Sequence, residues 1–141
     1  MKTSSYEEKI IKILKKEEVS FQREKIFKGL KRKRFDFFLP EKQIVIEVDG
    51  EYHFAPIKRK RQEFLKHQEN DRIKNSFCLR NGIALYRVPF WEINHVNSLA
   101  DLTQDKFLVK SKWHNDNLRG DFILNDKTRA KRRAIKNSRK H

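Results

Sequence analysis

The stretch Phe35–Gly50, FDFFLPEKQIVIEVDG, decides the fold. Its first part, Phe35–Leu39, is apolar apart from one acid and stops at Pro40, so it predicts a strand that ends there. Gln43–Val48 is the clearest strand of the chain, because it is β-branched and mostly apolar, and it ends at Asp49-Gly50. Since only a short Pro-Glu-Lys connection joins the two segments, they are expected to form a hairpin.

The segments around the hairpin alternate between helical and extended patterns. The capping-box pattern Ser4-Ser5-Tyr6-Glu7, followed by apolar residues at helical spacing, predicts a helix over residues 4–18. A helix between the third and fourth strands could cross over the sheet, so we expect an α/β fold with a mixed central sheet and flanking helices. The remaining elements are expected as strands over 19–27 and 83–88 and helices over 62–81 and 92–102.

The chain is strongly basic for its length. Its 141 residues include 34 Lys and Arg against 19 Asp and Glu, a net charge of +15. Such an excess repels itself in a compact state, so a polyanionic partner is expected, and a ribosomal protein is one alternative. No segment approaches the ~20 apolar residues of a membrane-spanning helix, and the start is polar and acidic from Ser4 onward. An intracellular location without membrane contact is therefore expected.

Length and composition also predict the domain organisation. One compact domain is expected over residues 1–126. The last fifteen residues, 127–141, hold eight Lys or Arg and no acid, so they predict a solvated tail that stays disordered until it meets a polyanion. Cys78 is the single cysteine, which excludes a disulfide framework and a cysteine-based zinc site. We expect it to pack in the interior.

Three acids lie on the two strands of the hairpin. Asp36 is inside an apolar strand, where a charge is costly unless it is compensated, and Glu47 and Asp49 are two apart, so they share a face. If the strands pair, the three carboxylates converge and raise one another's pKa unless a cation is present. Mg²⁺ is the natural occupant, and Mn²⁺ is expected to substitute for it. A metal ion there can polarise a phosphodiester and lower the pKa of an attacking water.

Each of these residues also has a simpler interpretation. The acids could form surface salt bridges with some of the many bases, and Asp49 alone would suit a turn. His53 could orient or deprotonate a water, or it could be an ordinary loop histidine. His67, Asp71 and Lys74 share one face of the helix expected over 62–81, where Asp71 and Lys74 could form only a surface ion pair.

Basic residues gather in three clusters, which we expect to contact DNA phosphates. Such contacts position a duplex and carry no sequence information. Trp91 and Trp113 could stack on bases or pack in the core. The predicted DNA-binding residues are Lys31, Arg32, Lys33 and Arg34 in the first cluster, Lys58, Arg59, Lys60 and Arg61 in the second, and Lys131, Arg132 and Arg133 in the tail.

Four segments resemble, in order and spacing, the PD-(D/E)XK nuclease superfamily, and most closely its very-short-patch-repair-like branch with the EDxHD homing endonucleases. They are RFDFFLP at 34–40, IVIEVDGEYHF at 44–54, NDRIKNSFC at 70–78 and IALYRVPF at 83–90. The resemblance covers roughly residues 4–98. It implies a restriction-endonuclease-like core and Mg²⁺-dependent hydrolysis of phosphodiester bonds in DNA.

The resemblance also implies roles for single residues. Asp36 takes the place of the superfamily's first aspartate and Glu47 that of its second acid. Asp49 occupies the position where most members have a lysine that positions or activates the attacking water. The branch often lacks this lysine, and His53 is then the favoured substitute, with Lys74 on the following helix as the other candidate.

Glu7 matches an acidic residue on the branch's first helix that completes the site, although it could be only a capping-box glutamate. The resemblance favours a homing endonuclease encoded by a phage or mobile element, without a small-molecule cofactor. A mismatch or junction repair nuclease, a mobile-element nicking nuclease and a non-catalytic nucleic-acid-binding protein are the alternatives, and RNA is an alternative substrate. One small site cuts one strand, so a double-strand break would indicate a homodimer or higher oligomer.

Overall fold

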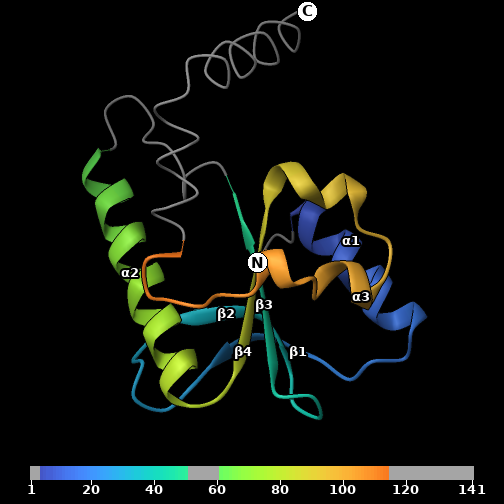
Figure 1. Cartoon of the computed structure of the whole chain (residues 1–141), viewed down its shortest axis with the longest axis horizontal. Coiled ribbons are helices and arrows are strands. Elements are labelled where there is room, and N and C mark those ends of the chain that lie inside the picture. The colour runs from blue at the N-terminus through green and yellow to red at the C-terminus, as the bar shows by residue number, and fades with distance from the viewer. Residues whose placement is uncertain (1–3, 51–60, 115–141) are drawn as a thin grey trace, which may run out of the picture.

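The computed structural model describes residues 4–50 and 61–114. Within these ranges the chain forms a four-stranded sheet with strand order β1-β2-β3-β4 and with helices on both faces (Figure 1). The predicted α/β fold with a mixed sheet and flanking helices is therefore confirmed. The elements are α1 (Ser5–Lys16), β1 (Gln22–Ile26), β2 (Arg34–Leu39), β3 (Ile44–Asp49), α2 (Arg61–Arg80), β4 (Ala84–Pro89), the 3-10 helix η2 (Phe90–His95), α3 (Leu99–Leu102) and the 3-10 helix η3 (Asp105–Phe107).

The predicted hairpin forms the centre of the sheet. β2 and β3 pair antiparallel, with Phe38 opposite Val45. Their connection is closed by Gln43, whose side chain donates to the Pro40 carbonyl at 2.7 Å. β4 then pairs parallel to β3, and α2 makes the crossover between them, as expected. The sheet is mixed because one connection is a tight turn and the other is a helix.

Apolar side chains fill both faces of the sheet. One cluster joins residues of α1, such as Ile10 and Leu14, to sheet residues such as Ile46. The other lies beneath α2 and includes Val45 and Cys78. Burying each large apolar side chain contributes about 1.5–3 kcal/mol, so the two clusters hold the helices against the sheet. Cys78 is 1% exposed and packs in the interior, as predicted.

The single helix expected over 92–102 is wrong. The structure has two short helices there, η2 (Phe90–His95) and α3 (Leu99–Leu102). Ser98 begins the second one, because its hydroxyl accepts a hydrogen bond from the Asp101 backbone N–H at 3.1 Å. Ser98 and Asp101 have the spacing of a capping box, and this motif restarts the helix. The first strand is also shorter than the range 19–27, since β1 begins at Gln22.

Several predictions concern residues outside the described ranges. These are His53, the basic residues at 58–60, the side chain of Arg61, and the domain boundary and tail beyond residue 114. None of the helices within the described ranges combines the length and apolar character needed to cross a bilayer.

Candidate active site

Asp36 and Glu47 meet where the ladder between β2 and β3 ends. On that side the last paired residues of the ladder are Phe37 and Ile46. Next to it, Asp36 Oδ2 accepts a hydrogen bond from the Val48 backbone N–H at 2.9 Å, so the carboxyl group satisfies a strand donor. The Asp36 and Glu47 carboxyl groups are also hydrogen-bonded to each other. The structure thus brings together two of the three predicted metal ligands.

Lys74 reaches this carboxyl pair from α2. Its Nζ lies 2.7 Å from Glu47 Oε1, with side-chain exposures of 15% for Lys74 and 5% for Glu47. The ammonium group also lies 5.0 Å from the centre of the Phe35 ring. Lys74 therefore pairs across to the sheet, and the interpretation of a surface ion pair with Asp71 on the same helix is wrong.

The two acids differ in proton affinity. Burial, and then the charge of Glu47, raise the pKa of Asp36 well above its ordinary value. Burial also acts to raise the pKa of Glu47, but Lys74, the hydrogen bond from Asp36 and Arg87 outweigh it, so the pKa of Glu47 is lowered. Without a metal ion the shared proton belongs to Asp36. This is the behaviour expected of converging carboxylates in the absence of a metal cation.

Asp49 belongs to a buried network centred on Arg87. The Arg87 side chain is 1% exposed and its Nη1 donates to Asp49 Oδ1 at 2.8 Å. Its Nε donates to Asn75 Oδ1 at 2.7 Å, and its Nη1 lies 3.4 Å from Asp71 Oδ1. Burial works against the charge, but Asp71, Asp49 and Glu47 raise the pKa of Arg87 further above its ordinary value. The network ties β3, β4 and α2 together beneath the helix.

The position of Asp49 bears on its predicted role. Asp49 is fully buried, so it is neither a solvent-exposed turn aspartate nor part of a surface salt bridge. Its carboxylate is engaged by Arg87, and binding a metal would require it to share that contact. Its role as a metal ligand stays a prediction.

The acids outnumber the cations in this region. We call it the carboxylate cluster, and its members are Asp36, Glu47, Asp49, Asp71, Lys74 and Arg87. If all its groups ionise, four carboxylates and two cations leave a net charge of minus two. One divalent cation would balance this charge. Mg²⁺ commonly binds through only one or two carboxylates and keeps its waters, so the Asp36–Glu47 pair suits it. Within residues 4–50 and 61–114 no group of three or more metal-binding side chains is found.

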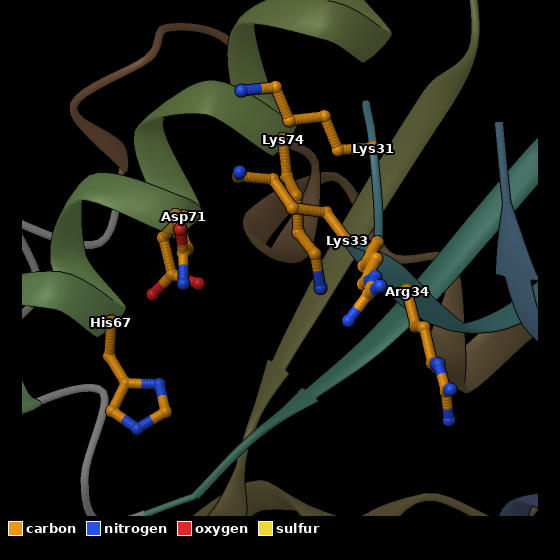
Figure 2. Close-up of a pocket in the computed structure, with 8 residues that line it drawn as sticks. Lys31, Lys33, Arg34, His67, Asp71 and Lys74 are labelled. Atoms are coloured by element: carbon orange, nitrogen blue, oxygen red, sulfur yellow. The ribbon is translucent and has the colours of Figure 1, made fainter. Parts of the chain in front are cut away.

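A pocket of about 630 Å³ lies beside the cluster, between α2 and the turn that precedes β2. Figure 2 shows Lys31, Lys33 and Arg34 on the turn side and His67 and Asp71 on the helix side. The first predicted DNA-binding cluster therefore lies next to the candidate catalytic residues. The full lining is Lys31, Arg32, Lys33 and Arg34 from the turn and His67, Asn70, Asp71 and Lys74 from α2.

Glu7 is linked to the site through one arginine. Its backbone N–H donates to the Ser4 hydroxyl at 3.2 Å, so it takes part in the helix cap. Its carboxylate instead binds Arg23, with 2.6 Å between Oε2 and Nη2. Arg23 Nε in turn donates to the backbone carbonyl of Asp36 at 3.4 Å. A direct contact of Glu7 with substrate or metal stays a prediction.

The two tryptophans lie outside the buried core. Trp91 is 38% exposed and Trp113 is 45% exposed. The guanidinium of Arg72 lies 4.6 Å from the Trp113 ring centre, and the Lys112 ammonium lies 4.9 Å from it. Of the two alternatives, packing in the core is therefore wrong, and stacking on bases stays a prediction.

Sequence reasoning missed Arg87 and Asn75. Arg87 lies within the apolar strand segment IALYRVPF, where a charge needs buried partners. The argument that identified Asp36 in its own apolar strand applies equally to Arg87, so the signal was available. Asn75 carried no such signal, because a polar residue on a half-buried helix is ordinary.

Comparison with known proteins identifies a family without a described activity. A family model described as "Protein of unknown function (DUF2726)" matches residues 8–106. The matched range contains the whole sheet, α2 and the carboxylate cluster. No curated protein matches the chain, and no solved structure does.

Proposed function

The chain belongs to the DUF2726 family, whose description names no activity, and we propose that it is a metal-dependent DNA endonuclease. One observation carries the proposal. The carboxyl groups of Asp36 and Glu47, on neighbouring strands, are hydrogen-bonded to each other, and the Lys74 ammonium lies 2.7 Å from Glu47. A basic pocket adjoins them, so a phosphodiester could reach the acids. A protein that only binds nucleic acid gains nothing from acids directed at phosphates.

The proposed fold family is that of the PD-(D/E)XK nucleases. The order of elements and the position of both acids on the β2–β3 hairpin agree with the resemblance in the sequence. A mixed sheet between helices also suits a restriction-endonuclease-like core. A fold alone does not define an activity, so the proposal depends on the site.

Asp36 and Glu47 would hold Mg²⁺, with Mn²⁺ as a substitute. When bound, the ion would polarise the phosphodiester and lower the pKa of a coordinated water. The chain itself supplies the electrostatic environment of the two carboxyl groups. Burial of the two carboxyl groups strengthens their electrostatic interactions, and their shared hydrogen bond holds them side by side. If all groups of the carboxylate cluster ionise, its net charge of minus two balances the charge of one divalent cation.

Lys74 is the residue that we propose to assist the attacking water. The sequence favours His53 for this role, because it closely follows the β3 strand. Lys74, however, contacts the second acid directly, and its charge could orient the water or stabilise the developing negative charge on the phosphate. Lys74 is therefore the preferred candidate for assisting the attacking water, and His53 is the alternative.

The biological role divides between two kinds of enzyme. A homing endonuclease and a nuclease that nicks a mismatch, a junction or a mobile element would use the same chemistry. A double-strand break would indicate two or more copies of the chain, since one such carboxyl pair is found in the part of each copy that the structure describes. Mapping the cleaved ends would distinguish a nick from a double-strand break.

A non-catalytic nucleic-acid-binding protein is the second candidate. The absence of a three-residue metal group within residues 4–50 and 61–114 favours it. The Lys74 ammonium also already neutralises Glu47 in this structure. Such a protein would bind plasmid DNA but leave it intact with either Mg²⁺ or Mn²⁺.

The test is relaxation of a supercoiled plasmid. We expect wild-type protein to cut the plasmid with Mg²⁺ but not with EDTA, and Glu47→Gln to lose the activity. Glu92→Gln is the matched control, because Glu92 also pairs with a lysine, Lys106, at 3.4 Å, but is not part of the carboxylate cluster. It should cut like wild type. Cleavage by Glu47→Gln at the wild-type rate would refute the proposed site.

A further inference from the structure

The pocket between α2 and the basic turn has two different walls. We define the basic turn as residues 28–34. Its wall carries four consecutive cationic side chains, whereas the helix wall presents the polar side chains of His67 and Asn70, which are exposed. At its inner end lie Lys74, bound to Glu47, and Asp71, next to Arg87. A ligand that fits both walls needs an anionic side and a side that forms hydrogen bonds.

The basic turn is anchored in its conformation without a ligand. Leu30 is 6% exposed and packs in the cluster beneath α2. Its N–H donates to the Phe27 carbonyl at 3.2 Å, and its own carbonyl accepts from the Lys33 N–H at 3.1 Å. Lys31 has a φ of +55°, a left-handed conformation that costs free energy for any residue except glycine. The surrounding contacts hold this strain, so they fix the backbone from which the cations project.

The cationic side chains of the turn are available to bind an external anion. Arg34 forms an ion pair with Glu24 at 3.4 Å. In the described part of the chain no carboxylate pairs with Lys31, Arg32 or Lys33. Three positive charges around one pocket are therefore available to phosphate oxygens.

The helix wall suits the other side of a nucleotide. His67 and Asn70 lie at i and i+3, so they project from the same face of α2. A side-chain amide such as that of Asn70 both donates and accepts, which matches the hydrogen-bonding edges of bases. In a duplex the Watson–Crick edges of the bases face the partner strand, so a side chain on α2 reaches them only when the strand is unpaired.

We propose that this pocket binds one nucleotide of single-stranded DNA, with its phosphate on the basic turn and its base toward α2. The proposal rests on the proposed function for the placement of this nucleotide beside the cleaved bond, at Lys74 and Glu47. It specifies the substrate class as DNA with a single-stranded segment at the cut. A pocket of about 630 Å³ is within the size range of small-ligand pockets, which fits one nucleotide of a single strand.

Binding is tested without metal, so that no cleavage is needed. The affinity for a fluorescent 12-nucleotide single strand and for a hairpin duplex of the same sequence is measured by anisotropy at several salt concentrations in EDTA. We expect tighter binding to the single strand. Lys33→Gln should reduce the slope of log K against log salt by ~0.7 on the single strand, the value for one lost phosphate contact.

Two further variants distinguish the walls. Lys12→Gln removes the same charge from the exposed face of α1, away from α2, and should leave the slope unchanged. Asn70→Ala should weaken single-strand binding by about 2- to 10-fold, the effect of one hydrogen bond, with no change in slope and no change on the duplex. These side chains are exposed, so the fold is expected to persist.

Three outcomes would overturn the proposal. One is an equal change of slope in Lys33→Gln and Lys12→Gln, which would indicate diffuse attraction to surface charge. Another is an Asn70→Ala effect that is absent or equal on both DNAs, and the third is tighter binding of the duplex. If the binding results agree with expectation while neither the plasmid nor DNA with a single-stranded segment is ever cut, the pocket stands and only the proposed function fails.

Discussion

Replacing Arg87 by Met should destabilise the protein strongly. The substitution keeps a long side chain but removes the cation that contacts Asp49 at 2.8 Å and Asp71 at 3.4 Å. It also leaves Asn75 Oδ1 without its 2.7 Å donor. Because removing one partner of a buried ion pair leaves the other charge uncompensated, the expected loss is about 3–5 kcal/mol. Total stability of a domain is about 5–15 kcal/mol, so this loss is a large part of it.

Urea denaturation followed by tryptophan fluorescence measures this loss. With an m-value of about 2 kcal/mol/M, the midpoint should fall by roughly 1.5–2.5 M. Arg34→Met is the matched control, because the Arg34–Glu24 pair is exposed and its two groups are 3.4 Å apart. Its cost should not exceed about 1 kcal/mol.

A double variant tests the cause of the loss. Adding Asp49→Asn to Arg87→Met removes one of the buried negative charges, so it should recover part of the stability. The coupling free energy between the two positions is expected at about 0.5–3 kcal/mol. If Arg87→Met does not fold, recovery of a folded double variant still supports the reasoning. A loss in Arg87→Met no greater than that in Arg34→Met would refute it.

Four further predictions concern the site, the core and the tail. Lys74→Met should slow single-turnover cleavage by about 10²–10⁴-fold and His53→Ala by less, whereas the reverse ranking would assign the role to His53. Burial and Glu47 raise the pKa of Asp36, so its contribution to metal-free stability is complete below about pH 4 and is lost as the pH rises. In EDTA, Asp36→Asn should therefore become increasingly stable relative to wild type as the pH rises above about 4, and it should no longer cut DNA. Burial raises the pKa of Cys78 to about 12, so iodoacetamide at pH 8 should modify this thiol in urea but not in the native protein. Deleting residues 127–141 should reduce the salt slope of duplex binding by ~0.9 for each lost phosphate contact, and an unchanged slope would exclude the tail from DNA binding.

The sheet could be predicted from the sequence because its signals are local. An apolar run stopped by Pro40 and a second run ended by Asp49-Gly50 define β2 and β3 without knowledge of the rest of the chain. The connections then restrict the topology, since a short turn requires antiparallel neighbours and a helix permits parallel ones. The break between η2 and α3 was missed because the apolar spacing continues through it. Only the capping motif at Ser98 marks it.

The site was predictable only in part, because some of its residues are brought together by the packing of separate elements. Asp36 and Glu47 could be brought together by hairpin pairing alone, because opposite residues of paired strands share a face. Lys74 and Arg87 depend on how α2 and β4 pack against that face. Lys74 follows Glu47 by 27 positions, and helical periodicity gives its face but not its distance from the sheet. The buried charge of Arg87 implied partners, yet it did not say which ones.

The departure at Asp49 and the position of Lys74 are connected through the charges. The PD-(D/E)XK pattern that this sequence resembles has a lysine two residues after the second acid, and this chain has an aspartate at the corresponding position. That aspartate binds Arg87, which also contacts Asp71 one turn before Lys74 on α2. The Asp49–Arg87 pair thus helps to hold the helix that presents an ammonium 2.7 Å from Glu47. A lysine on β3 and a lysine on α2 are two ways to place a cation beside the same acid, and the buried network makes the second one possible.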